Sequence, residues 1–221
     1  MTALAGWTPR PRPGRATLAG RYCRLEPLDP ARHGDDLFAA SMAPGAEERF
    51  RYLFDVPLDR AGFDAWLARS AASEDPLFQA VIDVATGRCE GRQTLMRITP
   101  EHGVIEIGNI LWGPAIARGR VATEALYLAA RHVFDELGYR RFEWKCNARN
   151  EPSRRAAGRF GFAFEGVFRS HMVVKGESRD TAWFAMTDAD WPALRARFER
   201  WLAPANFDPA GRQKARLAGP G

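Results

Sequence analysis

The fold is decided by residues 103–147, which read GVIEIGNILWGPAIARGRVATEALYLAARHVFDELGYRRFEWKCN. The stretch begins with a strand-like run over 103–112 and ends with a second strand-like run over 139–147. Between them, residues 122–137 carry apolar side chains at helical spacing, and Gly138 ends the pattern. A strand, a helix and a strand of these lengths form a crossover, so the two strands are predicted to be parallel.

Further strand and helix patterns lie on both sides of this crossover. In chain order they are a strand at 21–28, helices at 30–42 and 60–72, strands at 77–84 and 88–98, a helix at 151–160, a hairpin over 162–188 that turns at Gly176, and a helix ending at Leu202. The strands before the crossover form an antiparallel meander. We therefore predict an α+β fold with a mixed, mostly antiparallel sheet of about seven strands flanked by helices.

The length and composition indicate one globular domain. The chain has 221 residues, of which 46% are hydrophobic and 27% charged, proportions that exclude disordered and fibrous classes. We expect a flexible N-terminal arm over 1–17, a single domain over 18–203 and a C-terminal tail over 204–221. No apolar run reaches the ~20 residues that span a bilayer, and the first basic residues follow a short apolar stretch, so we expect a cytoplasmic protein and no membrane partner.

The net charge of +5 favours anionic partners, which include nucleic acid, acidic lipid and phosphorylated cofactors. The basic residues are spread along the chain, and aromatic residues are not interleaved with them as in a base-stacking platform. Nucleic acid is therefore not the favoured partner. A basic nucleic-acid-binding module is kept as an alternative.

Cysteine and histidine residues are few and scattered. The three cysteines and four histidines show neither a disulfide framework nor metal-ligand spacing, so no metal is expected. None of the cysteines lies in a Cys/His setting that would indicate an acyl-enzyme.

Arg118, Gly119 and Arg120 stand directly before the predicted central helix. A helix N-terminus offers unpaired N–H groups and a positive dipole end, and glycine allows a ligand to approach the backbone closely. The same dipole disfavours cations at that position. The pattern therefore predicts an anion-binding site, and the alternative is a solvated pair of arginines.

Two motifs in this order resemble the GNAT superfamily of acetyl-CoA-dependent N-acetyltransferases, in particular its RimJ/RimL branch. They are ATEA at 122–125, and Asn150-x-x-Ser153 followed by Gly161-Phe162 and Glu165-Gly166. The resemblance covers about residues 18–200. It implies acetyl-CoA as the acyl donor, a primary amine on a small molecule or a peptide N-terminus as the acceptor, and direct attack of that amine in a ternary complex. The acceptor stays open, as do a homodimer and the alternative of a non-catalytic acyl-CoA sensor.

The resemblance implies that the coenzyme diphosphate binds backbone amides of the loop entering the central helix. That loop contains Arg118, Gly119, Arg120, Val121, Ala122 and Thr123. In the family it usually reads Gln/Arg-x-x-Gly-x-Gly/Ala, and this chain departs from that spelling. Alignment on ATE puts Arg120 at the glycine position, whereas alignment on Gly119 leaves an extra residue before the helix. We expect the two arginine side chains to make up part of the difference.

The resemblance also places the pantetheine arm along the 103–112 strand, paired with its backbone like an added strand. Gly108 suits a bulge or a close approach there. An N–H near Leu111 or Trp112 is expected to stabilise the oxyanion that forms when the amine attacks. Glu106 matches an acid that the family carries on this strand and is the candidate base, although an outward-facing strand carboxylate is the alternative.

Asn150 and Ser153 carry the remaining implied roles. In the family the Asn contacts the pantetheine amides, and the Ser lies near the thiol, where its hydroxyl is expected to hydrogen-bond the departing thiolate. The alternatives are an N-cap for Asn150, which is compatible with the coenzyme contact, and a solvated surface position for Ser153. Many family members use a tyrosine of this helix as the acid, and residues 151–162 contain none. Glu143 and Lys145 are either two-faced strand residues or part of the substrate cleft.

Overall fold

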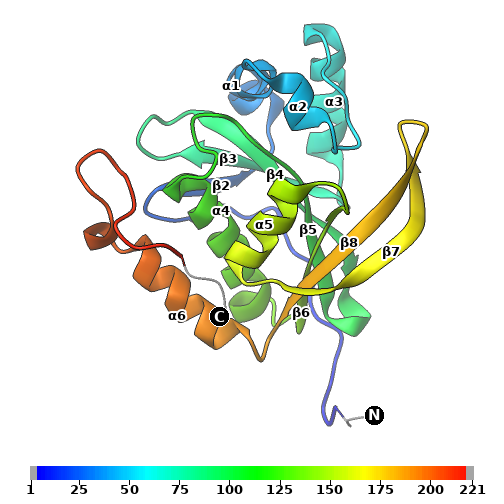
Figure 1. Ribbon diagram of the computed structural model, residues 1–221, viewed down its shortest axis with the longest axis vertical. Coiled ribbons are helices and arrows are strands. Elements are labelled where there is room, and N and C mark those ends of the chain that lie inside the picture. The colour runs from blue at the N-terminus through cyan, green and yellow to red at the C-terminus, as the bar shows by residue number, and fades with distance from the viewer. Residues whose placement is uncertain (1–3, 218–221) are drawn as a thin grey trace.

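The computed structural model describes residues 4–217, which form an eight-stranded sheet in the order β1-β2-β3-β4-β5-β6-β8-β7 (Figure 1). The strands are β1 (Leu18–Ala19), β2 (Cys23–Pro27), β3 (Leu77–Asp83), β4 (Cys89–Thr99), β5 (Val104–Trp112), β6 (Arg141–Asn147), β7 (Ala163–Val174) and β8 (Glu177–Thr187). All neighbours are antiparallel except β5 and β6, which are parallel. The predicted fold class is confirmed. The strand beyond the seven predicted is β1, a two-residue strand at the sheet edge.

Six α-helices accompany the sheet in the described residues. They are α1 (Pro30–Met42), α2 (Ala46–Phe50), α3 (Arg60–Ala72), α4 (Arg120–Arg131), α5 (Glu151–Phe160) and α6 (Trp191–Leu202). Short 3₁₀ turns cover Pro100–His102 and Pro204–Asn206. Five of the helices match predicted ones, and α2 was not predicted because five residues are too few to show a helical period.

The β5–α4–β6 crossover has the predicted parallel geometry, but its helix differs at both ends. It begins at Arg120, two residues before the predicted start, because extended Gly119 is its N-cap. After Arg131 the chain continues in a π-helical turn over His132–Glu136, where the Leu137 N–H donates to the His132 carbonyl at 3.0 Å. Gly138 then ends the helical segment with φ 70°.

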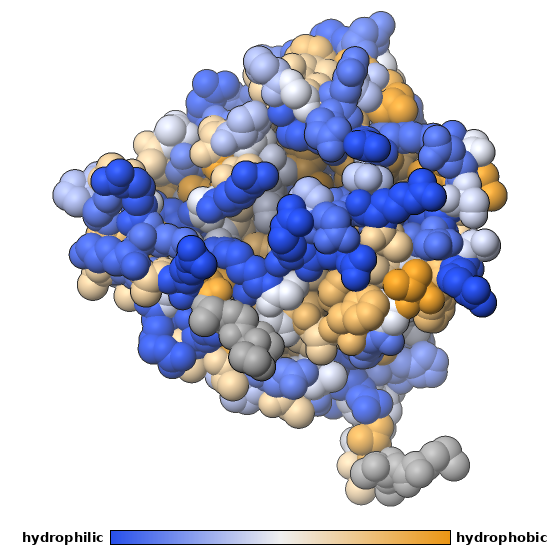
Figure 2. Space-filling model, in the orientation of Figure 1, coloured by the Kyte–Doolittle hydropathy of each residue, from blue (hydrophilic) through white to orange (hydrophobic). Residues whose placement is uncertain are grey.

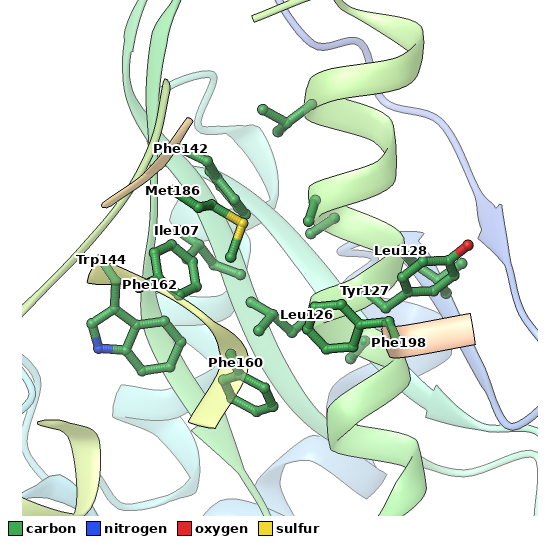
Figure 3. Packing of buried hydrophobic residues seen from close by; sticks show 14 of the residues in the cluster. Ile107, Leu126, Tyr127, Leu128, Phe142, Trp144, Phe160, Phe162, Met186 and Phe198 are labelled. Carbon is green, nitrogen blue, oxygen red and sulfur yellow. The ribbon is translucent and has the colours of Figure 1, made fainter. Parts of the chain in front are cut away.

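The central helix α4 lies in the core, and all its residues over 121–130 are buried. Figure 3 shows Leu126 of α4 turned toward side chains of the sheet, and Tyr127 beside Phe198 of α6. The sheet side chains include Ile107, Phe142 and Met186. A helix that is buried around most of its circumference positions its N-terminus rigidly, and that terminus faces the site described below.

The opposite face of the sheet carries a second, smaller core. Phe78, Ala80 and Ile82 of β3 pack with α1 and α3, whereas Leu77 and Val81 belong to the cluster around α4. This alternation follows from the two-residue period of a strand. Helices α1, α2 and α3 lie together at the top of the molecule in Figure 1, while α4 runs through its centre and packs against α6.

Both terminal segments contact the domain where the structure describes them. Near the N-terminus, the Trp7 indole N–H donates to the Glu101 carbonyl at 2.9 Å. Near the C-terminus, the buried Phe207 ring packs edge-on against Trp201 and Tyr22. Over residues 4–217, no helix has the length and apolar character required to cross a membrane.

Candidate active site

The parallel pairing of β5 with β6 stops halfway along β5. Residues from Val104 to Ile107 pair with residues from Arg141 to Trp144, and the Ile107–Trp144 pair is the last. Both strands continue beyond it, β5 to Trp112 and β6 to Asn147. Their C-terminal halves therefore diverge and leave backbone N–H and C=O groups along a gap, which is the splayed edge predicted for this strand.

A β-bulge lies beside this gap. On β4, Thr94 pairs with Gly108 and Arg92 with Leu111, so Asn109 and Ile110 together oppose Gln93. Asn109 has φ 48°, a left-handed conformation. The buried Arg92 guanidinium donates to the Asn109 carbonyl at 3.2 Å and to its Oδ1. The bulge expected near Gly108 is thus one residue further along, held by Arg92.

The gap opens into a cleft of about 700 Å³. Strand β5 lines it from Glu106 to Trp112 and so defines its two ends. We call the end beyond Trp112 the helix end, and it is lined by Ala117, Arg118, Ala122, Thr123, Arg155 and Arg159. We call the other end the ion-pair end, and it is lined by Arg97, Glu106, Lys145 and Arg179, with Tyr52, Leu53 and Phe54 after α2.

At the helix end, the first turn of α4 presents unpaired amides. The N-cap Gly119 has no side chain to cap the helix, and its carbonyl accepts the Thr123 N–H at 3.2 Å. The preceding amides, those of Arg120, Val121 and Ala122, have no acceptor within the helix. Arg159 of α5 donates to Thr123 Oγ1 at 3.2 Å, which brings a guanidinium to this end. The dipole and this guanidinium favour an anion.

The structure separates the two arginines of the loop. Arg118, at φ 61°, lines the cleft. Arg120 turns away, and its guanidinium lies 4.6 Å from the Tyr22 ring centre and 5.6 Å from that of Phe207. Of the six loop residues predicted to bind the coenzyme, Arg118, Ala122 and Thr123 line the cleft, whereas Gly119, Arg120 and Val121 are outside its lining.

At the ion-pair end, Glu106 is 3% exposed. The alternative prediction, an outward-facing strand carboxylate, is therefore wrong. Glu106 Oε2 accepts from Arg97 Nη1 at 2.7 Å and from Lys145 Nζ at 2.8 Å. Its Oε1 is 3.4 Å from where a Cβ on Gly108 would stand, so Oε1 lies over that glycine. Because Oε2 is engaged twice, Oε1 is the oxygen left to accept a proton.

Lys145 connects Glu106 to a second carboxylate. Its Nζ lies 2.6 Å from Glu143 Oε2, and it sits 3.9 Å from the centre of the Trp183 ring. Only Lys145 of the Glu143–Lys145 pair lines the cleft. The ion pairs of Lys145 with both Glu106 and Glu143 hold the Glu106 carboxylate in one orientation.

The start of α5 brings Asn150 and Ser153 to the cleft wall. Asn150 Oδ1 accepts the Ser153 N–H at 3.1 Å, so Asn150 is the N-cap of α5. Ser153 Oγ accepts from the Trp144 indole N–H at 3.0 Å. The Ser153 hydroxyl therefore keeps its own hydrogen available for a further acceptor.

The amides of Leu111 and Trp112 point to opposite sides of β5. The Gly113 N–H donates to the Glu90 carbonyl at 2.7 Å, and Leu111 lies opposite Arg92 in the same register. Hydrogen-bonded pairs alternate along an antiparallel ladder, so the Leu111 amide faces β4 and the Trp112 amide faces the gap. The Trp112 indole nitrogen is also buried with no hydrogen-bond partner in the described residues.

Five arginines that line the cleft were not predicted from the sequence, namely Arg49, Arg97, Arg155, Arg159 and Arg179. Arg155 and Arg159 are four residues apart on α5 and therefore share one face, a signal that was readable next to the Asn150 motif. Arg179 reaches the cleft from β8 and gave no local signal. No group of three metal-ligating side chains occurs within residues 4–217.

The chain is similar to a known protein family and to several solved structures. The model of the "Acetyltransferase (GNAT) domain" family matches residues 24–163. A GCN5-related N-acetyltransferase from Brucella melitensis is 60% identical, with 97% of each chain covered and a TM-score of 0.95. A probable GNAT-family acetyltransferase from Chromobacterium violaceum is 39% identical over 87% of this chain and 96% of the other, with a TM-score of 0.80.

A more distant structure shares the fold alone. It is the microcin C7 self-immunity acetyltransferase MccE in complex with acetyl-CoA and AMP, which is 17% identical over 76% of this chain and 93% of the other, with a TM-score of 0.66. The search of curated proteins returned no match.

Proposed function

Because this chain belongs to the GNAT acetyltransferase family and is an acyltransferase, we propose that it moves the acetyl group of acetyl-CoA directly to a primary amine in a ternary complex. The observation that carries the proposal is the divergence of β5 and β6 beyond Ile107, which joins a free strand edge to the N-terminus of α4 in one cleft. A free edge suits an extended amide-bearing arm, and a helix N-terminus suits a phosphate.

The helix end of the cleft fits the diphosphate of coenzyme A. The amides at the start of α4 are hydrogen-bond donors, and Arg118 and Arg159 supply charge-assisted donors beside them. The pantetheine arm would follow the free edge of β5 toward the ion-pair end. MccE, which shares the fold, has been solved with acetyl-CoA, and this supports acetyl-CoA as the donor here.

Transfer requires a base, an oxyanion donor and a group that receives the thiolate. Glu106 Oε1 takes the proton from the attacking amine, directly or through a water. The Trp112 amide, which faces the gap, donates to the oxyanion as the C–N bond forms. The carbon–sulfur bond then breaks, and the Ser153 hydroxyl hydrogen-bonds the departing thiolate, which takes up a proton from solvent.

Placement in the RimJ/RimL branch rests on the Asn150-x-x-Ser153 motif and its downstream glycines. A homodimer is proposed on the evidence of β7, an edge strand on which Phe164, Phe168 and Val173 are more than half exposed. Figure 2 shows hydrophobic surface over β7 on a face that is otherwise largely hydrophilic. Such an apolar edge is a candidate for pairing with a second copy.

Two measurements test the proposed function. Calorimetric titration with acetyl-CoA should show one saturable site, and a panel of primary amines should show thiol release at saturating acetyl-CoA. Binding without turnover on any amine would support an acyl-CoA sensor instead. Absence of coenzyme binding, with salt-sensitive affinity for DNA or RNA, would replace the proposal by a nucleic-acid-binding module.

A further inference from the structure

Arg179 is a buried cation without a partner. It is 7% exposed, and its Nε is enclosed with no hydrogen-bond acceptor in the described part of the chain. No carboxylate of residues 4–217 forms an ion pair with it. Burial lowers the pKa of its guanidinium, an effect that Cys146 and Glu106 oppose and the positive charge of Arg97 reinforces.

Arg92, the other buried arginine of the described residues, and the buried ammonium of Lys145 are both paired with carboxylates. Arg92 donates to Asp55 Oδ2 at 2.8 Å and to Asn109, and Lys145 lies between Glu106 and Glu143. Burying an uncompensated charge costs several kcal/mol, so a chain keeps one only where another benefit offsets the cost. The unpaired guanidinium of Arg179 therefore indicates that the anion it binds comes from a ligand and not from the chain.

The position of Arg179 in the cleft indicates which ligand carries the anionic group. It lines the cleft at the ion-pair end, with the Phe54 ring centre 5.2 Å from its guanidinium carbon. The ion-pair network there joins three cations (Arg97, Lys145 and Arg141) to three carboxylates (Glu106, Glu143 and Glu165). These six charges balance, and Arg179 has no carboxylate among them. The partner is thus an anionic group that enters the cleft where the acceptor amine must stand.

We propose that Arg179 binds an anionic oxygen group, a carboxylate or a phosphate, carried by the acceptor amine. This inference rests on the proposed function. A guanidinium presents forked N–H donors that match such a group, while Glu106 Oε1 faces the amine of the same molecule. Amino acids and phosphorylated amines fit this pair of sites. Polyamines do not, because they offer only positive charge to Arg179.

The test uses matched acceptors that differ in one charge. Free amino acids are compared with their amides, and O-phosphoethanolamine with ethanolamine, by kcat/KM for thiol release at saturating acetyl-CoA. We expect the anionic member of one pair to be preferred about 10- to 100-fold, the effect of one charge-assisted contact. The two pairs distinguish a carboxylate from a phosphate.

Substitution of the arginine gives the second arm. Arg179→Gln should remove that preference through KM, while kcat/KM for the neutral member and the acetyl-CoA affinity stay within about threefold. Arg169→Gln, which removes an exposed charge on β7, should retain the preference. Arg179→Met should leave the Tm of the free protein unchanged or higher, because it removes an unpaired buried charge.

Three results would overturn the inference. They are equal use of anionic and neutral acceptors by the unmodified protein, an equal loss for both in Arg179→Gln, and a marked fall of Tm in Arg179→Met, which would assign Arg179 a structural role. In each case thiol release from some amine keeps the proposed function. Absence of turnover with every amine would instead remove the proposed function, and this inference with it.

Discussion

The two ends of the cleft are built in different ways. The main-chain donors of the helix end come from one segment, Arg118 and the first turn of α4, and α5 adds the side chains of Arg155 and Arg159. The ion-pair end comes from four strands, which contribute Arg97, Glu106, Lys145 and Arg179 from β4, β5, β6 and β8. In the proposed function, the coenzyme diphosphate would bind mainly the start of one helix, whereas the acceptor would bind side chains that four strands bring together.

The difference extends to electrostatics. The helix end is positive because backbone amides without an acceptor meet the guanidinium groups of Arg118, Arg155 and Arg159 there, so it suits an anionic group. At the ion-pair end, most charges neutralise one another, and Arg179 remains. Substitutions at the helix end should therefore alter coenzyme affinity, and substitutions at the ion-pair end should alter turnover or acceptor choice.

The largest effect is expected at the ion-pair end. Glu106→Gln should lower kcat about 100- to 1,000-fold, because the amide cannot accept the amine proton. The acetyl-CoA affinity should stay unchanged, since Glu106 is six residues along β5 from Trp112. The measurement is steady-state turnover from pH 6 to 10 together with calorimetry. The residual rate should keep rising with pH as solution supplies neutral amine.

Glu143→Gln is the matched control for this change. Glu143 shares Lys145 with Glu106, but it does not line the cleft. Its loss should reduce kcat less than about tenfold. Equal losses in the two variants would show that Glu106 only positions Lys145, and they would remove it as the base.

The next effect belongs to the helix end. Gly119→Asp should raise the acetyl-CoA Kd about 100-fold, because the new carboxylate would occupy the amides proposed for the diphosphate and repel it. Asp is a favoured N-cap, so Tm should hold or rise. A Cβ at this position lies 3.1 Å from the Ile116 carbonyl, which calls for only a small shift.

Gly119→Ala separates the steric part of that effect from the charge. It adds the same Cβ without a carboxylate, and its Kd should stay within about tenfold of that of the unmodified protein. Unchanged affinity in Gly119→Asp would mean that the first turn of α4 does not hold the diphosphate.

A smaller effect distinguishes the two loop arginines. Arg118→Gln should raise the acetyl-CoA Kd about tenfold, with a weaker dependence on salt, since Arg118 lines the cleft. Arg120→Gln should change Kd less than about threefold and lower stability by about 0.5–1 kcal/mol, because its guanidinium stacks on Tyr22. A larger rise in Kd for Arg120→Gln than for Arg118→Gln, measured by calorimetry, would indicate that Arg120 binds the coenzyme.

The smallest effect is expected at Cys146, the one cysteine that lines the cleft. Burial raises the pKa of its thiol, although the nearby Ser153 side chain opposes the rise. No histidine of residues 4–217 lines the cleft to activate it. Cys146→Ala should keep kcat within about threefold. A large loss, with an acetylated cysteine detected by mass spectrometry after incubation with acetyl-CoA alone, would replace direct transfer by an acyl-enzyme.

Much of the fold was predictable because its signals are local. Asp29 and Asp59 cap α1 and α3 through their side chains, so the predicted starts of both helices agree with the structure. The fully buried α4 and its flanking strands gave the crossover and its parallel pairing. The π turn at His132–Glu136 was not predicted, because an i to i+5 pattern differs little from a helical one over five residues.

The site was predictable only in part. Gly108 marked the region of the bulge, but the two-against-one register that puts it at Asn109 requires the position of β4. The resemblance identified Glu106, whereas its contacts with Arg97 and Lys145 depend on strands β4 and β6 flanking β5. Arg120 was assigned to the same anion as Arg118, because sequence adjacency does not reveal that the side chains diverge toward different surfaces.

The amino-acid sequence by itself determined the fold class, the order of the elements and the approximate start of the central helix, since caps, periodicity and glycine placement act within a few residues along the chain. Tertiary structure alone decided which charges meet. Arg179 and Glu106 are 73 residues apart in a sequence that contains 32 basic and 27 acidic side chains, and only strand order selects the few that become neighbours. The physical reason is that Coulomb interactions and burial depend on distance in space, to which sequence separation is a poor guide.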